Sequence, residues 1–103
     1  MNEAKGAQFG KALGDVTRQR ILRYCCCSRK SVGEIAENVQ VTQPTASHHL
    51  AILEEAGLTR RFQEGKMVYY EVNQEAIVNC CGQLLLRIAP DQKEAHQICN
   101  CCS

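Results

Sequence analysis

Four residues that favour helix starts divide most of this chain into short helices. Asp15, Ser31, Thr42 and Asn73 each stand immediately before a stretch suited to a helix. Side chains of these types accept hydrogen bonds from the free amides of a first helical turn. The short helices that follow leave room in 103 residues for one domain only. With a first helix added, the predicted helices cover residues 4–13, 16–27, 32–39, 43–56 and 74–89.

Two short stretches between the last two helices have the composition of strands. Residues 58–62 and 67–72 are joined by residues 63–66, where Gly65 is free to take a positive φ. This pattern predicts a β-hairpin. Helices followed by a hairpin and a last helix predict a mainly α (α+β) fold, a winged helix-turn-helix with a two-stranded β-hairpin wing.

Apolar residues at helical spacing indicate which helix faces are buried. On the second helix these residues are Val16, Ile21, Leu22, Cys25 and Cys26. The same face assignment places Arg18, Arg20 and Arg23 outside. On the fourth helix the inner residues are Ala46, Leu50 and Leu53.

The distribution of charge says more than the formal net charge of +1. Residues 17–70 hold eight Lys or Arg against five Asp or Glu, whereas residues 71–103 hold two against four. The middle of the chain is therefore the better face for a phosphate backbone. No apolar run is long enough to cross a bilayer and none opens the chain, so we expect a cytoplasmic protein without a membrane span. No pattern resembles an activated nucleophile with a positioned base, so we expect no enzyme.

Cysteine is the one residue type present in abnormal number. Eight cysteines occur, and they are clustered rather than scattered. In a reducing cytosol such clusters indicate a soft-ion site or redox chemistry, although single members can be small buried apolar residues. The last cluster lies in a polar tail over residues 91–103, which we separate from a domain over residues 1–90. The cysteines are Cys25, Cys26, Cys27, Cys80, Cys81, Cys99, Cys101 and Cys102.

Several short motifs follow one another along the chain. They are Phe9-Gly-Lys-Ala-Leu-Gly-Asp15, Thr17-Arg18, Arg20-Ile21-Leu22, and the stretches over residues 31–36, 42–50, 53–58 and 64–70. In this order they resemble the ArsR/SmtB family of repressors, over about residues 9–88. The chain departs from the family at Val16, where the family usually has proline. The resemblance implies a repressor that binds operator DNA and releases it when an effector binds.

The resemblance also assigns the DNA-binding elements. A recognition helix places the residues of its N-terminal end against base edges in the major groove, and a wing neutralises backbone phosphates. We expect His49 to pack instead, because it directly precedes the core residue Leu50. The alternative is that the polar helix face and the charged hairpin are only solvated. The expected DNA-binding residues are Thr42, Gln43, Thr45, Ser47, His48, Arg60, Arg61 and Lys66.

The last predicted helix carries an apolar stripe broader than a small domain needs on an outer helix. Its members are Ile77, Cys81, Leu84 and Ile88. The stripe predicts a homodimer through terminal helices. In the family this helix pairs with the first helix and with its own symmetry mate, which sets two recognition helices about one DNA turn apart.

Family members bind effectors at several places, and three of these lack their ligands here. Residues 76–89 contain no His, Asp or Glu, and the recognition helix contains no cysteine. Ser31 and Gly33 stand where one branch has a Cys-x-Cys pair. Thiolates elsewhere remain, and they favour As(III) and Sb(III) as well as Cd(II), Pb(II), Hg(II) and Cu(I). We expect a thiophilic effector, first As(III) or Sb(III), and no catalytic cofactor.

The first expected ligands are Cys80 and Cys81. They point about 100° apart around one helix, so a third thiolate is needed to complete a site. The tail offers candidates in Cys99, Cys101 and Cys102. The second choice is the cluster Cys25, Cys26 and Cys27, in which Cys25 continues the row of Ile21 and is expected in the core.

Two other interpretations stay open at this point. A branch of the family senses persulfides or oxidants through one cysteine on the second helix and one on the last. Its cysteine positions correspond here to Arg23 and to Ile88 or Ala89, although Cys25 and Cys81 lie on the same two helices. A different class of protein is a zinc-structural interaction module in which His96 and the tail cysteines hold Zn(II).

Overall fold

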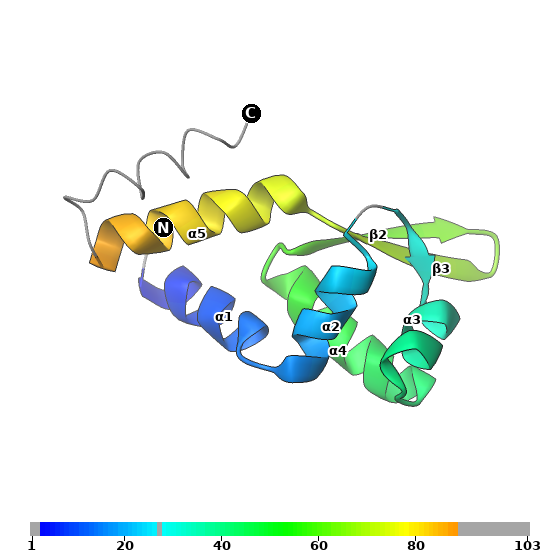
Figure 1. Cartoon of the computed structure of the whole chain (residues 1–103). Helices are drawn as coiled ribbons and strands as arrows, with labels where there is room; N and C mark the ends of the chain where they lie inside the picture. The colour runs from blue at the N-terminus through cyan, green and yellow to red at the C-terminus, as the bar shows by residue number, and fades with distance from the viewer. Residues whose placement is uncertain (1–2, 27, 89–103) are drawn as a thin grey trace.

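The computed structural model describes residues 3–26 and 28–88, with side chains left undescribed at 84, 85, 87 and 88. In this part of the chain, helices and strands follow the predicted order closely (Figure 1). The fold is a winged helix-turn-helix. Its elements are α1 (Glu3–Leu13), α2 (Val16–Tyr24), β1 (Lys30–Ser31), α3 (Val32–Val39), α4 (Gln43–Glu55), β2 (Thr59–Glu64), β3 (Met67–Val72) and α5 (Gln74–Ile88).

The wing has one strand more than the predicted hairpin. The sheet order is β1-β3-β2, with both pairings antiparallel, and Lys30 and Ser31 lie opposite Tyr70 and Tyr69. Two residues have no periodicity, so this strand exists only through its contact with β3 and could not be found from the sequence. The β2–β3 turn is also shorter than predicted. It consists of Gly65, with φ 60°, and Lys66.

The four predicted helix starts are confirmed. Asp15 Oδ1 accepts a hydrogen bond from Arg18 N at 3.0 Å, and Thr42 Oγ1 accepts one from Thr45 N at 3.3 Å. Ser31 and Glu34 form a reciprocal capping box. Asn73 Oδ1 accepts from the amide of Ala76 at 3.2 Å. Each cap fixes where a helix begins and therefore which side chains stand at its exposed first turn.

The predicted faces of α2 need correction. Val16 is 64% exposed and Cys26 is exposed, whereas Arg18 is only 8% exposed. The buried row is Arg18, Ile21, Leu22 and Cys25, at spacings of three, four and seven residues. The arginine is kept inside because its donors meet carbonyl oxygens, a contact that hydrophobicity alone cannot reveal. The helix also ends at Tyr24 with Cys25 as C-cap, and Cys27 lies outside the described residues.

The core lies between α1, α2, α3, α4 and the sheet. Ala46, Leu50 and Leu53 on α4 are buried, as predicted. The start of α5 is anchored to this core by two backbone hydrogen bonds, from Val72 N to the Cys25 carbonyl and from Asn73 N to the Leu58 carbonyl. From this anchor α5 runs back beside α1 (Figure 1).

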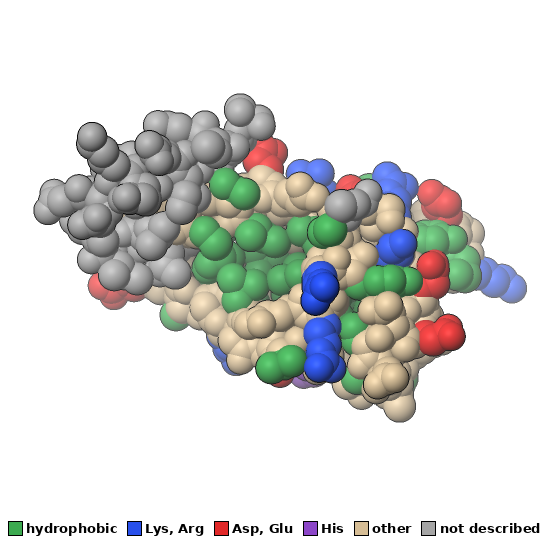
Figure 2. Space-filling view, in the orientation of Figure 1, with side chains coloured by type: hydrophobic (Ala, Val, Ile, Leu, Met, Phe, Trp, Pro, Cys, Tyr) green, Lys and Arg blue, Asp and Glu red, His purple; other side chains and the backbone are tan. Residues whose placement is uncertain are grey.

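One face of the molecule carries an apolar band. Figure 2 shows hydrophobic side chains gathered in a band between α5 and the helices α1 and α2 beneath it. Partly buried side chains of α5, those of Ile77, Cys80 and Cys81, pack against the core from this region. Among the described residues, no helix is long and apolar enough to cross a membrane.

Candidate nucleic-acid interface and effector cysteines

The helix α4 presents a polar face at its N-terminal end. Thr42 caps it and Pro44 stands in its first turn, where proline is tolerated because that amide has no helical partner. The burial of Ala46, Leu50 and Leu53 fixes the rotation of the helix about its axis. That rotation leaves the predicted DNA-binding side chains outside. Thr42, Gln43, Thr45, Ser47 and His48 are all exposed.

A hollow of about 330 Å³ lies between the start of α3, the start of α4 and the wing tip. Gln43 and Ser47 form one wall, and Lys66 forms another. The first turn of α3 also lines it, and the Ser31–Glu34 capping box closes that end of the helix. Gln43 crosses from α4 to α3 so closely that a Cβ at Gly33 would lie 3.4 Å from its Nε2. The hollow therefore offers amide, hydroxyl and ammonium donors to one phosphate or base edge.

The other two wing cations do not line this hollow. Adjacent residues of a strand point to opposite sheet faces, and Arg60 and Arg61 obey this rule on β2. Arg60 Nη2 donates to Asn73 Oδ1 at 3.3 Å, at a second hollow that Cys26 also lines. Arg61 lies beside the buried Tyr70, whose pKa is raised mainly by burial. The structure thus groups Lys66 with Gln43 and Ser47, and it separates Arg60 and Arg61 from them.

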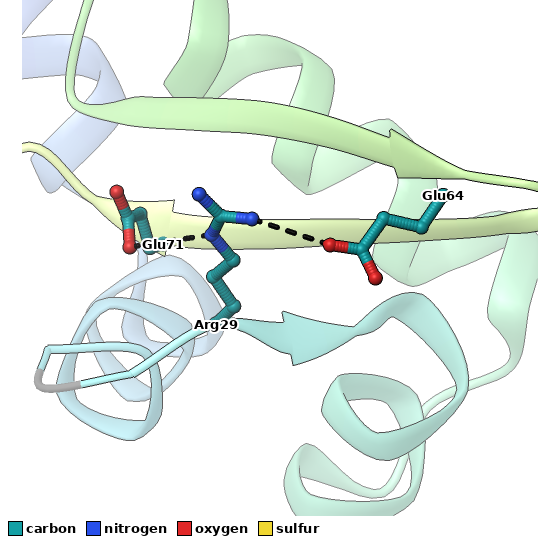
Figure 3. Close-up of polar contacts among 3 residues, drawn as sticks. All are labelled: Arg29, Glu64 and Glu71. Atoms are coloured by element: carbon teal, nitrogen blue, oxygen red, sulfur yellow. Dashed lines mark hydrogen bonds and ion pairs between the residues drawn. The ribbon is translucent and has the colours of Figure 1, made fainter.

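Sequence reasoning missed Arg29, which fixes the wing (Figure 3). Its guanidinium lies 3.6 Å from the centroid of the Phe62 ring. Its Nη1 is 3.4 Å from Glu64 Oε1, and its Nε is 3.9 Å from Glu71 Oε2. One side chain just before β1 thus contacts both long strands of the sheet. Nothing in the sequence signals this contact, because it depends on the unpredicted pairing of β1.

The first cysteine cluster has two different environments. Cys25 is fully buried, as expected of a core residue, and burial raises the pKa of its thiol to about 11. Cys26 is exposed, and its carbonyl accepts a hydrogen bond from Gln74 Nε2 at the start of α5. A protonated, buried thiol is a poor ligand and a poor nucleophile. Of the two, only Cys26 is open to solvent.

The second cluster lies where α5 meets the rest of the domain. Cys80 lines a hollow of about 350 Å³ together with Gln8 of α1 and Glu55 at the end of α4. Burial raises the pKa of the Cys81 thiol, and the neighbouring Cys80 raises it further. Cys99, Cys101 and Cys102 lie outside the described residues. Within residues 3–26 and 28–88, no three His, Cys, Asp or Glu side chains come together as a metal site.

The predicted dimer stripe is described only in part. Ile77 and Cys81 are half-buried and pack against the core of their own chain. The side chains of Leu84 and Ile88 lie outside what the structure describes. Beyond Cys81, the stripe therefore stays a prediction from spacing.

Comparison with known proteins identifies the family. The family model described as "Bacterial regulatory protein, arsR family" matches residues 15–60. The transcriptional repressor SdpR of Bacillus subtilis is 32% identical over 75 residues, which are 73% of this chain and 83% of that protein. The chain belongs to the arsR family.

Two further relatives of this arsR-family chain carry metals in their names. The cadmium resistance transcriptional regulatory protein CadC homolog of Staphylococcus aureus is 33% identical over 78 residues, 69% of this chain and 60% of that protein. The probable mercury resistance operon repressor of Streptomyces lividans is 28% identical over 94 residues, 91% of this chain and 74% of that protein.

Solved structures agree with the fold of this arsR-family chain. Reduced HlyU from Vibrio cholerae is 30% identical, with a TM-score of 0.66 over 85% of this chain and 92% of that one. The homodimeric winged helix-turn-helix DNA-binding domain Mb0332 from Mycobacterium bovis is 26% identical, with a TM-score of 0.69 over 90% of this chain and 84% of that one.

Proposed function

We propose that this arsR-family chain is a homodimeric transcriptional repressor that binds operator DNA and releases it when a thiophilic ion binds its cysteines. The observation that carries the proposal is the hollow in which Gln43, Ser47 and Lys66 meet the start of α3. It combines a side-chain amide that pairs with a base edge and a cation that neutralises a phosphate. In this arrangement Gln43 selects sequence and Lys66 supplies affinity for any DNA, while Arg60 and Arg61 add charge from the base of the wing.

Salt dependence of DNA binding tests this division of roles. Lys66→Ala should weaken binding to specific and random DNA alike and reduce the salt slope by about 0.9 for each phosphate that is no longer neutralised. Arg23→Ala is the matched control, because it removes one exposed cation on α2 that does not line the hollow at Lys66. Gln43→Ala should relax the preference at one base position and leave the slope unchanged. Equal slopes for the Lys66 and Arg23 variants would contradict the proposal.

Dimerisation is supported by the apolar band between α5, α1 and α2 and by the homodimeric state named for the Mb0332 domain. A twofold axis near α5 would place two copies of α4 on successive half-sites. Sedimentation of the wild type should give a dimer. Leu84→Asp should give a monomer, because it places a charge in the predicted stripe. A Leu84→Asp dimer that still binds DNA would refute the predicted interface.

For the effector, we propose As(III) or Sb(III) bound by Cys80 and Cys81 with one tail thiolate from Cys99, Cys101 or Cys102. The cadmium and mercury relatives support a thiophilic ion in general. Support for the place comes from the hollow at Cys80, which lies between α1, α5 and the end of α4. An ion bound there can couple the terminal helices α1 and α5 to α4, the proposed recognition helix. Because the pKa of Cys81 is raised, binding must displace a proton and should weaken as the pH falls.

A DNA-release titration with arsenite, Cd(II), Hg(II) and a polysulfide donor tests the effector. Cys80→Ser/Cys81→Ser should bind DNA like the wild type and fail to release it with arsenite. Cys26→Ser is the comparison variant, since that thiol is exposed and lies outside α5. Release of the double variant by arsenite would move the site to Cys26 and Cys27. Release of the wild type by polysulfide alone would establish redox sensing instead.

A further inference from the structure

The buried Arg18 joins three helices. Its Nε donates to the Ala12 carbonyl at 2.8 Å and its Nη2 donates to the Lys11 carbonyl at 2.9 Å, so it closes the C-terminal end of α1. Its Nη1 lies 3.1 Å from Nδ1 of His49 on α4. Its own backbone amide donates to Asp15 at the start of α2. A buried guanidinium with this set of partners connects α1, α2 and the recognition helix at one point.

The chemistry of the Arg18–His49 contact fixes the state of the imidazole. A guanidinium has donors only, so Nδ1 of His49 must be the acceptor and the ring proton must reside on Nε2. A doubly protonated imidazole has a proton on each nitrogen and would face Arg18 with a second cation. The contact therefore exists only with neutral His49.

The position of His49 on α4 indicates what the contact between Arg18 and His49 does. It stands between Leu50, which is fully buried, and His48, which is exposed. We propose that Arg18 is a positioning residue for DNA binding, which holds the recognition helix against the end of α1 through neutral His49. The proposal rests on the proposed function, since it concerns how α4 meets DNA. It adds a route from α1, a helix of the predicted dimer interface, to the residues that contact bases.

Among the described residues, few charged groups surround His49. From α2 it faces Arg18, and Asp15 stands at the start of the same helix, where the Arg18 amide lowers the pKa of its carboxyl. From α1 come the carbonyls that hold Arg18, next to the exposed Lys11. On α4 itself the neighbour is His48, with the two ring centroids 6.0 Å apart.

Two substitutions at His49 separate the contact from simple packing. His49→Asn places an amide Oδ1 where the imidazole has Nδ1, so it keeps an acceptor for Arg18 that cannot be protonated. His49→Leu keeps bulk and removes the acceptor. In free protein, amide exchange along α4 should be faster in His49→Leu than in His49→Asn. For folded dimers at pH 8, DNA affinity of His49→Leu should be about tenfold lower, the loss of one charge-assisted hydrogen bond, while His49→Asn should match the wild type.

The pH profile supplies a measurement that a purely structural role would not move. It is best taken in a His48→Asn background, because protonated His48 would strengthen DNA binding through its charge. As the pH is lowered from 8, loss of the unprotonated Nδ1 acceptor would break the contact with Arg18, so that background should lose affinity. Adding His49→Asn should remove this loss.

The outcomes are separable. Equal DNA affinity and equal α4 exchange for His49→Leu and His49→Asn would overturn the proposal, and so would a pH profile unchanged by His49→Asn. If His49→Leu does not fold, the pH profiles of DNA binding with and without His49→Asn test the proposal instead. If the wild type binds no DNA at all, the proposed function fails, while amide exchange still tests whether Arg18 holds α4.

Discussion

Removing Arg29 should loosen the wing without touching the residues proposed to contact DNA. In Arg29→Ala the protein loses the stacking on Phe62 and the ion pairs with Glu64 and Glu71. A cation over an aromatic ring at an exposed site contributes about 0.5–1 kcal/mol. The ion pairs involve side chains that are 45%, 66% and 31% exposed, so about 0.3 kcal/mol each is a fair value after screening.

These values predict that Arg29→Ala lowers the free energy of unfolding by about 1–1.5 kcal/mol. In a domain of this size the melting temperature should fall by about 5–10 °C. Glu64→Gln/Glu71→Gln removes the ion pairs and keeps the stacking, so it should account for roughly half of the loss. That contribution should vanish at high salt, because exposed charges are screened.

The assay is chemical denaturation followed by circular dichroism, paired with DNA binding. Arg20→Ala is the control, since Arg20 is exposed on α2 and has no hydrogen bond or ion pair within the described residues; its effect should stay within about 0.5 kcal/mol. A freer wing should also weaken DNA binding roughly threefold through Lys66. An Arg29→Ala protein as stable as Arg20→Ala would refute the reasoning.

Three further predictions concern single groups. Asp15→Ala should cost about 1 kcal/mol of unfolding free energy by removing an N-cap; because the Arg18 amide lowers the pKa of Asp15, its contribution should be present at neutral pH and lost as pH falls through that lowered value, a loss that Asp15→Asn should not show in an acid titration. Thr59→Val should be neutral or stabilising by up to about 1 kcal/mol in thermal unfolding, because the buried Thr59 hydroxyl has no hydrogen-bond partner in the described structure. Maleimide should label Cys26 in the native protein while sparing Cys25 until the protein unfolds, since Cys25 is buried with a pKa of about 11; mass spectrometry of peptides would show the reverse if the core assignment were wrong.

The helix starts and the buried face of α4 were predictable because each rests on local chemistry. A cap such as Asp15 or Thr42 needs only the next three residues, and Ala46, Leu50 and Leu53 follow from helical spacing. Arg18 was assigned to the outside because its burial depends on carbonyls from another helix. The third strand was missed for the same reason, since β1 exists only against β3.

The candidate site likewise has a part that the sequence predicts and a part that it does not. Exposure of Gln43, Ser47 and His48 followed from the period of α4. The grouping of Lys66 with Gln43, and the separation of Arg60 and Arg61 from them, required the orientation of the sheet, although strand alternation already implied that Arg60 and Arg61 diverge. The contacts of Arg29 with the wing could not be predicted, because its partners Glu64 and Glu71 lie 35 and 42 residues away in sequence.

The close approach of Gln43 to Gly33 has a consequence for changing which operator the protein prefers. A methyl group at position 33 would lie 3.4 Å from the Gln43 amide, at the near edge of ordinary van der Waals contact, and would restrict the rotamers from which that amide can reach a base. Gly33→Ala should therefore shift base preference at the Gln43 position in a selection from randomised operators, while every DNA-contacting side chain keeps its identity. A library that varies positions 33 and 43 together changes both the side chain that reaches the base and the space beside it. A library that varies Gln43 alone keeps Gly33 and tests only the rotamers that this glycine allows at position 43.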